Sequence, residues 1–198
     1  SDEYRLAFLP VNTIEGKQYL NWMNLALDYA FENREHMMDA VCGIVKQHIE
    51  KYAGRTVSFT DRINCHHNYA ALENHYGANV WVHRKGATRA RRGERAVIPG
   101  AMGSYSYVVE GKGNEESFCT SSHGAGRAYS RTGAMNMFTT EQVMVDLKEQ
   151  GVTLGKRKKN DVAEECRFAY KDIDLVMAQQ QDMVTPVRKL RTVGVVKG

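Results

Sequence analysis

The segment at residues 121–131, SSHGAGRAYSR, brings together side chains that can carry phosphoryl-transfer chemistry. In this segment His123 precedes Gly124, Gly126 and Arg127. A histidine nitrogen can attack phosphorus and hold the transferred group as a covalent intermediate. Glycines let backbone N–H groups approach a phosphate closely, and an arginine can pair with its oxygens. The ordinary alternative is a glycine-rich turn with a surface histidine, because short glycine motifs arise often by chance.

Two more stretches hold candidate ligands. The turn PGAMGS at residues 99–104 is rich in backbone N–H groups, which suits a nucleotide phosphate. His66 and His67 lie in a stretch with a two-residue period, which predicts a strand over residues 56–70. Alternation along a strand puts Cys65 and His67 on one face and His66 on the other. A metal role for one histidine therefore stays open beside an ordinary surface or core position.

The segment at residues 84–95 is strongly basic, with six cations and a single acid, Glu94. A basic loop between two short strands is usually a solvated hairpin, but this density of charge also suits the phosphates of a nucleic acid. The cations are Arg84, Lys85, Arg89, Arg91, Arg92 and Arg95.

A long helix is the clearest predicted element. Apolar residues at spacings of three and four predict it over residues 17–51. A break near Asn33 and Arg34 stays open, which would give two helices. Gly54 has the place of a C-terminal cap.

The rest of the chain predicts mixed structure. Thr139 and Gln142 form a capping box that opens a second helix. Asp172 begins another helix, and the composition of residues 190–196 predicts a final strand. We therefore predict an α+β fold, with antiparallel strands over residues 56–120 in layered sheets and helices packed outside.

The composition is that of a globular protein, and we expect one domain because neither repeats nor a linker divide the 198 residues. The net charge of +4 favours no class of partner by itself. The four cysteines lack a CxxC pair, so we expect reduced thiols in the cytoplasm. No signal peptide or bilayer-long apolar run is seen, so no membrane association is expected. The chain begins without a methionine, which suggests a fragment.

Four blocks in fixed order resemble the signature blocks of the RtcB family of RNA-splicing ligases. They are HHNYAALE at residues 66–73, HRKGAT at 83–88, PGAMGSYSYVV at 99–109 and SHGAGRAYSR at 122–131. The long helix and the final VVKG also resemble that family, so the resemblance covers essentially the whole chain. Each block is weak alone, but their order and joint presence are specific.

The resemblance implies a GTP- and manganese(II)-dependent RNA ligase that acts in tRNA splicing or RNA repair. Such an enzyme joins an RNA 3′-phosphate or 2′,3′-cyclic phosphate to a 5′-hydroxyl end. His123, in the HGAGR motif, would attack the α-phosphorus of GTP and hold GMP as a phosphoramidate. GMP would then move to the RNA 3′-phosphate, which becomes a good electrophile for the 5′-hydroxyl.

The resemblance also implies binding roles at matching positions. His67 matches a manganese ligand beside the nucleotide, and Asn68 matches a nucleotide contact. The other implied nucleotide contacts are Pro99, Gly100, Ala101 and Met102 around the guanosine, Ser106 and Lys197 at the guanine, and Gly124, Ala125 and Gly126 at the phosphates. In an RNA ligase, the loop arginines Arg89, Arg91, Arg92 and Arg95 become candidates for contacts with RNA phosphates.

The sequence departs from the family in two ways. Ala101 stands where the family commonly has serine, so one hydroxyl contact is missing. The blocks with the family's other metal ligands, an aspartate–cysteine pair and further histidines, are not found. We therefore expect the C-terminal part of a single catalytic domain, whose missing N-terminal half is its partner. Alone, this half should be inactive, and its uncovered apolar surface should promote self-association.

Two other functions stay open on the residues. One is a non-catalytic nucleic-acid-binding module that retains the basic loop and the fold. The other is a phosphohistidine carrier unrelated to RNA, which would carry phosphate on His123 without any guanosine.

Overall fold

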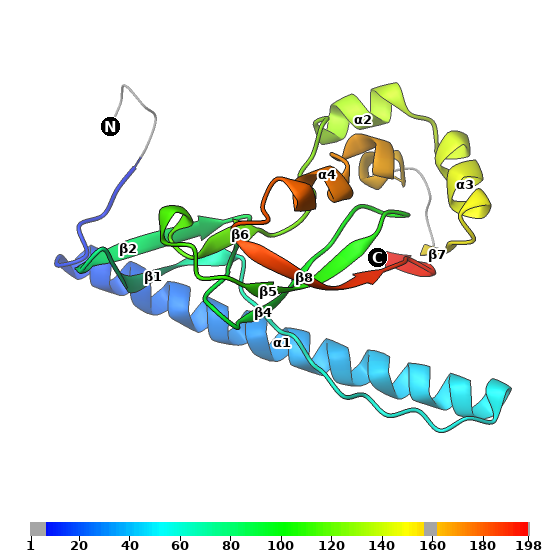
Figure 1. Ribbon diagram of the computed structural model, residues 1–198, viewed down its shortest axis with the longest axis horizontal. Coiled ribbons are helices and arrows are strands. Elements are labelled where there is room, and N and C mark those ends of the chain that lie inside the picture. Colours follow the sequence, from blue (N-terminus) through cyan, green and yellow to red (C-terminus); the bar gives the residue numbers. More distant parts are fainter. Residues whose placement is uncertain (1–6, 157–161, 198) are drawn as a thin grey trace. The chain divides into compact units, whose positions relative to one another are not determined.

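The computed structural model describes residues 7–156 and 162–197. Residues 1–69 and residues 70–198 form two compact units. The first contains one long helix and the second contains nearly all of the strands (Figure 1). The four cysteines are free thiols, as predicted.

Helix α1 (Ile14–Ala53) is a single helix of 40 residues without a break near Asn33 and Arg34. The hydroxyl of Thr13 caps its start by accepting from the Gly16 N–H at 3.1 Å. Gly54 ends it with φ +60°, a left-handed conformation that glycine adopts without strain. The predicted helix and its glycine cap are therefore confirmed.

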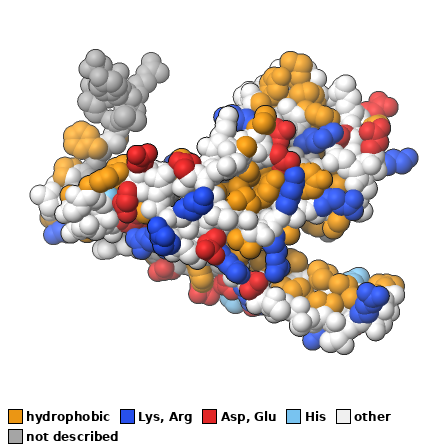
Figure 2. All heavy atoms as spheres, viewed as in Figure 1, with side chains coloured by type: hydrophobic (Ala, Val, Ile, Leu, Met, Phe, Trp, Pro, Cys, Tyr) orange, Lys and Arg blue, Asp and Glu red, His pale blue; other side chains and the backbone are white. Residues whose placement is uncertain are grey.

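The sequence of α1 consists mostly of good helix formers. Many of its apolar side chains are nevertheless exposed to solvent. Trp22 is 70% exposed and Tyr29 is 73% exposed. Figure 2 shows hydrophobic side chains on the surface of the helix toward its C-terminal end. Such a stripe is typical of a helix that packs against another surface.

The predicted strand over residues 56–70 is wrong for most of its length. Residues 54–66 have no regular secondary structure, and a strand begins only at Asn68. A period of two does not make a strand without a partner to accept its ladder of hydrogen bonds. The predicted alternation of Cys65, His66 and His67 between two faces is therefore wrong as well.

The second unit begins with a hairpin. Strand β1 (Asn68–His75) pairs with β2 (Ala78–Lys85). The two turn residues, Tyr76 and Gly77, both have positive φ, which matches the right-handed twist of a hairpin.

Three more small sheets complete the unit. Strands β3 (Ala87–Arg89) and β6 (Thr120–Ser122) form an antiparallel pair. Strands β4 (Arg95–Ile98), β5 (Ser106–Gly111) and β8 (Val184–Leu190) form an antiparallel sheet in that order. Strands β7 (Thr153–Lys156) and β9 (Gly194–Lys197) pair in parallel. The predicted strand at residues 190–196 thus falls partly on β8 and partly on β9.

Short helices lie together on one side of β5 and β8 (Figure 1). They are α2 (Arg131–Met137), α3 (Thr140–Glu149) and α4 (Ile173–Ala178), with the 3₁₀ turns η2 (Val162–Glu165) and η3 (Arg167–Ala169). Another 3₁₀ turn, η1 (Glu115–Ser117), comes between β5 and β6. The capping box at the start of α3 and the Asp172 cap of α4 are both present, as predicted.

The core of the second unit lies between these helices and the loop after β4. Leu147 and Val143 of α3 pack with Val162 and Cys166, and Met102 joins them from the loop. Helices and mostly antiparallel sheets thus form the α+β fold that the sequence predicts. Within the described residues, no helix has the length and apolar character needed to span a bilayer.

Candidate active site

His123 directly follows β6, and the pairing of β6 with β3 sets its surroundings. Ser122 lies opposite Ala87, so that Gly86, the residue before β3, comes next to His123. A Cβ atom built on Gly86 would lie 3.1 Å from Cε1 and 3.4 Å from Nδ1 of His123. The half-buried imidazole therefore packs on bare backbone. The HRKGAT and SHGAGR blocks meet at this contact.

Gln180 fixes the residue before His123. Its Oε1 accepts from the Ser122 N–H at 3.1 Å, and its Nε2 donates to Ser122 Oγ at 2.9 Å. The glutamine is 5% exposed, so both bonds are shielded from water. We did not predict it, because nothing distinguishes it within the three glutamines at residues 179–181.

The loop after His123 packs against the turn after β4. The Ala125 N–H donates to the Pro99 carbonyl at 3.1 Å. A Cβ atom on Gly124 would lie 3.2 Å from the same oxygen, and one on Gly100 would lie 2.1 Å from the Tyr105 carbonyl. Both glycines are therefore needed for close packing. The two predicted loops lie side by side next to His123.

The side chains of this turn point in different directions. Met102 is buried in the core and Ala125 is buried too, so either could meet a nucleotide only through its backbone. Ser106 Oγ accepts from the Gly100 N–H at 3.3 Å. Ala101 is half-buried, and its carbonyl accepts from the Ser104 N–H at 2.9 Å. These bonds shape the turn from within.

A cavity of about 320 Å³ opens beside the turn. Gly103, Ser104 and Tyr105 line one side of it, and Lys171 and Asp172 lie on another. The side chain of Lys197, which we expect at a guanine, lies outside the described part of the chain.

Arg127 does not stand open to a phosphate. Its guanidinium donates to the Glu164 carbonyl, to the Tyr170 hydroxyl at 2.9 Å and to the Tyr129 carbonyl at 3.0 Å. It also stacks over the Tyr170 ring at 4.8 Å. The arginine therefore holds the loop to residues 164–170, and its pairing with a phosphate stays a prediction.

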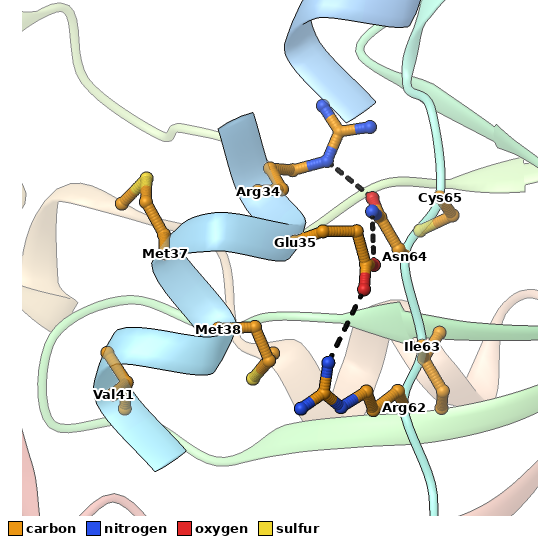
Figure 3. Close-up of a pocket in the computed structure, with 9 residues that line it drawn as sticks. All are labelled: Arg34, Glu35, Met37, Met38, Val41, Arg62, Ile63, Asn64 and Cys65. Carbon is orange, nitrogen blue, oxygen red and sulfur yellow. Dashed lines mark hydrogen bonds and ion pairs between the residues drawn. The ribbon is translucent and has the colours of Figure 1, made fainter. Parts of the chain in front are cut away.

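His67 and Asn68 belong to the first unit, where polar contacts with α1 hold the segment that leads to them (Figure 3). Asn64 is central to these contacts. Its Oδ1 accepts from Arg34 Nε at 2.6 Å, and its Nδ2 donates to Glu35 Oε1 at 2.6 Å. A charged network on one helix face thus fixes an irregular segment that has no strand ladder.

The same helix face continues this anchoring on both sides of Asn64. Arg62 pairs with Asp39 at 2.6 Å, and the Arg34 guanidinium lies 3.4 Å from His66 Nδ1. Arg34, Arg62 and the apolar Met38 line a cavity of about 370 Å³ between the helix and this segment. His66 therefore packs on α1, whereas His67 and Asn68 are exposed.

The basic segment contains less available charge than its composition suggests. The side chain of Arg84 is buried and makes a two-pronged pair with Glu73, at 2.7 and 2.9 Å. Arg89 pairs with Glu94 at 2.8 Å. Of the four loop arginines expected to contact RNA, the exposed ones are Arg91, Arg92 and Arg95.

Among the described residues, His67 does not belong to a group of three side chains that could hold a metal ion together. Of the described histidine, cysteine and carboxylate side chains, one group of three comes close enough to hold a cation, and it consists of His75, Glu115 and Cys119. Manganese(II) takes several oxygen and nitrogen ligands, so one imidazole does not make its site.

Comparison with known proteins gives a consistent result. The family model described as tRNA-splicing ligase RtcB matches residues 1–198. The RNA-splicing ligase RtcB of Escherichia coli K12 is 42% identical over 194 residues, which are 98% of this chain and 47% of that protein. The tRNA-splicing ligase RtcB of Methanococcus maripaludis is 34% identical, over 98% of this chain and 45% of that protein. The chain spans about half the length of the curated relatives that it matches.

Proposed function

Because the chain belongs to the RtcB family of tRNA-splicing ligases, we propose that it is the C-terminal half of an RNA ligase. The complete enzyme would join an RNA 3′-phosphate or 2′,3′-cyclic phosphate to a 5′-hydroxyl end. It would use GTP, manganese(II) and a covalent GMP intermediate on His123. The RNA would be a cleaved tRNA or another broken strand.

The position of His123 carries this proposal. Its ring lies on the backbone of Gly86, while the Gly124 loop packs against the Pro99 turn. Gln180 holds Ser122, the residue before His123, through two hydrogen bonds. A nucleophile needs this kind of fixed geometry, because small displacements from the reacting atom cost large factors in rate.

The proposed chemistry has two transfers and a joining step. A neutral nitrogen of His123 attacks the α-phosphorus of GTP, and the bond to the pyrophosphate oxygen breaks. The GMP group then moves from His123 to the RNA 3′-phosphate. Finally the 5′-hydroxyl attacks the activated phosphate, loses its proton and displaces GMP. The backbone N–H groups of Gly124 and Gly126 would face the phosphates, since the Ala125 N–H is bonded to the Pro99 carbonyl.

Manganese(II) would stabilise charge on the triphosphate when bound. His67 is the residue of this chain that we expect among its ligands, and the other ligands would come from the N-terminal half. The remaining nucleotide contacts proposed from the family resemblance are those of Asn68, Ser106, Lys197 and the backbone of residues 99–102.

RNA joining by the complete protein tests the proposal. The two halves together, with GTP and manganese(II), should join RNAs with the two matching ends. His123→Ala should abolish the joining, whereas His83→Ala, a change at an exposed histidine without an assigned role, should preserve it. Joining by the His123→Ala protein would rule out the proposed intermediate. RNA binding without joining in the unchanged protein would favour a binding module instead.

A further inference from the structure

Three side chains outside the proposed active site form a compact cluster of metal-ligating groups. An imidazole nitrogen of His75, a carboxylate oxygen of Glu115 and the sulfur of Cys119 lie within 4.8 Å of one another. His75 ends β1, Glu115 begins the 3₁₀ turn η1, and Cys119 lies two residues after the end of that turn. All three belong to the second unit.

The cluster is enclosed on two sides and open at one. The His75 side chain is 4% exposed and Cys119 is buried, whereas the Glu115 side chain is 57% exposed. His75 Nδ1 lies 2.9 Å from Glu115 Oε2, and Cys119 Sγ lies 3.8 Å from Glu115 Oε1. An ion could therefore enter past the carboxylate, and water could complete its coordination.

The second nitrogen of His75 is held as in many metal sites. Its Nε2 lies 3.1 Å from Glu73 Oε2, and Glu73 is fixed by the buried Arg84. A ligating histidine commonly donates its other N–H to a carboxylate, which sets the tautomer and leaves the first nitrogen free for the metal. The Glu73–Arg84 pair supplies that carboxylate without adding net charge to the cluster.

We propose that His75, Glu115 and Cys119 bind a zinc ion, with water as the fourth ligand. One thiolate, one imidazole and one carboxylate suit zinc, which is tetrahedral and accepts nitrogen, oxygen and sulfur. Manganese(II) prefers oxygen-rich sites, so this site is separate from the one expected at His67. The proposal does not depend on the proposed ligase activity.

The exchange of protons for zinc balances in charge. In the hydrogen-bonded cluster the His75 Nδ1–H and the Cys119 S–H both face the Glu115 carboxylate. Zinc binding releases both protons to solvent, so that an imidazolium, a thiol and a carboxylate become an imidazole, a thiolate and a carboxylate around Zn²⁺. The cluster is neutral overall before and after the exchange. The ion would join the end of β1 to the turn that leads into β6 and His123.

Cobalt(II) and zinc titrations of the purified 198-residue chain test the site without GTP or RNA. We expect one equivalent of cobalt(II) to give a thiolate-to-cobalt charge-transfer band, which zinc removes. Cys119→Ser should abolish the band, and Glu73→Gln should weaken zinc binding by about 10- to 100-fold. Cys65→Ser and His67→Ala, which change candidate ligands of the first unit, should leave the band intact.

Glu115→Gln provides a second variant, because this exposed side chain can be changed without opening the core. It should weaken zinc binding by about tenfold or more. The site would be disproved if cobalt(II) gave no thiolate band in the unchanged chain. Loss of the band on Cys65→Ser but not on Cys119→Ser would disprove it too. In either case the three side chains are a proton-bridged network only.

Discussion

At the scale of single residues, the contact between His123 and the backbone of Gly86 is the feature that most constrains the proposed chemistry. His123 itself could be predicted from its motif and from the family resemblance. Its neighbours could not, because Gly86 and Gln180 come from segments whose closeness depends on strand pairing and on the end of α4. Sequence spacing also gave no sign of the intrachain partners of Arg127 and Arg84, which lie 37 and 11 residues away.

Gly86→Ala should slow the formation of the His123–GMP intermediate in the complete protein by about tenfold or more. The new methyl group would lie 3.1 Å from the His123 ring, and displacement of a nucleophile lowers rates steeply. Gly93→Ala is the matched control, because Gly93 also has a positive φ but has nothing within 4 Å of its Cβ position. Both changes add left-handed strain of about 1–2 kcal/mol. Equal rates of GMP transfer in the two variants would refute a positioning role for Gly86.

At the scale of elements, the sequence predicted those with strong local signals and missed those that depend on partners. Helix α1 has its apolar period and both caps, and α3 has its capping box. Strand β8 contains Pro186, which argues against a strand in the sheet interior. It is tolerated because β8 is an edge strand beside β5, with an irregular register at Val108 and Val109.

The loop between β3 and β4 should contact RNA mainly through its exposed arginines. Changing both Arg91 and Arg92 to Gln should weaken RNA binding uniformly across sequences. The slope of log K against log salt should fall by roughly 0.7 to 0.9 for each lost phosphate contact. The same double change at Arg188 and Arg191, which are exposed outside the loop, removes equal charge and serves as control. An unchanged slope in the loop variant would leave the loop as a solvated hairpin.

A charged link joins α4 to the β4–β5–β8 sheet and should make stability depend on pH. Asp174 accepts from Lys189 Nζ at 2.6 Å and from the Tyr107 hydroxyl at 2.6 Å, and these bonds lower the pKa of Asp174 below its usual value. A lowered pKa in the folded state stabilises the protein above the unfolded pKa, and this gain is lost as pH falls through the folded pKa.

Asp174→Asn should therefore lower the thermal midpoint by a few degrees at pH 7, and by less as pH falls below about 4. Thermal unfolding followed by circular dichroism across pH 2.5 to 7 measures this difference. In a Lys189→Met background the same change should have a smaller pH dependence. A difference that stays constant across the pH range would show that the charge on Asp174 does not contribute.

At the scale of the whole molecule, the chain spans about half the length of the curated relatives that it matches. The exposed apolar side chains of α1 support an additional packing partner, for which the N-terminal half is our candidate. Self-association of the isolated chain through this surface, and the assignment of all 198 residues to one catalytic domain, stay predictions. The sequence could indicate an N-terminal half only because the family's other metal-ligand blocks are not found in it. The apolar pattern of a helix shows that a face can be covered, but it does not identify the segment that covers it.

The central claim is that His123 carries GMP once the ligand set of the complete protein is present. Intact-mass and peptide mass spectrometry after incubation with GTP and manganese(II) measures this directly. We predict no added mass on the isolated chain, and one GMP mapped to His123 when the N-terminal half is supplied. This mass should be lost in His123→Ala and kept in His83→Ala. A His123→Ala protein that still gains GMP would contradict the account. GMP transfer to the isolated chain would contradict our inference that this chain lacks the other metal ligands.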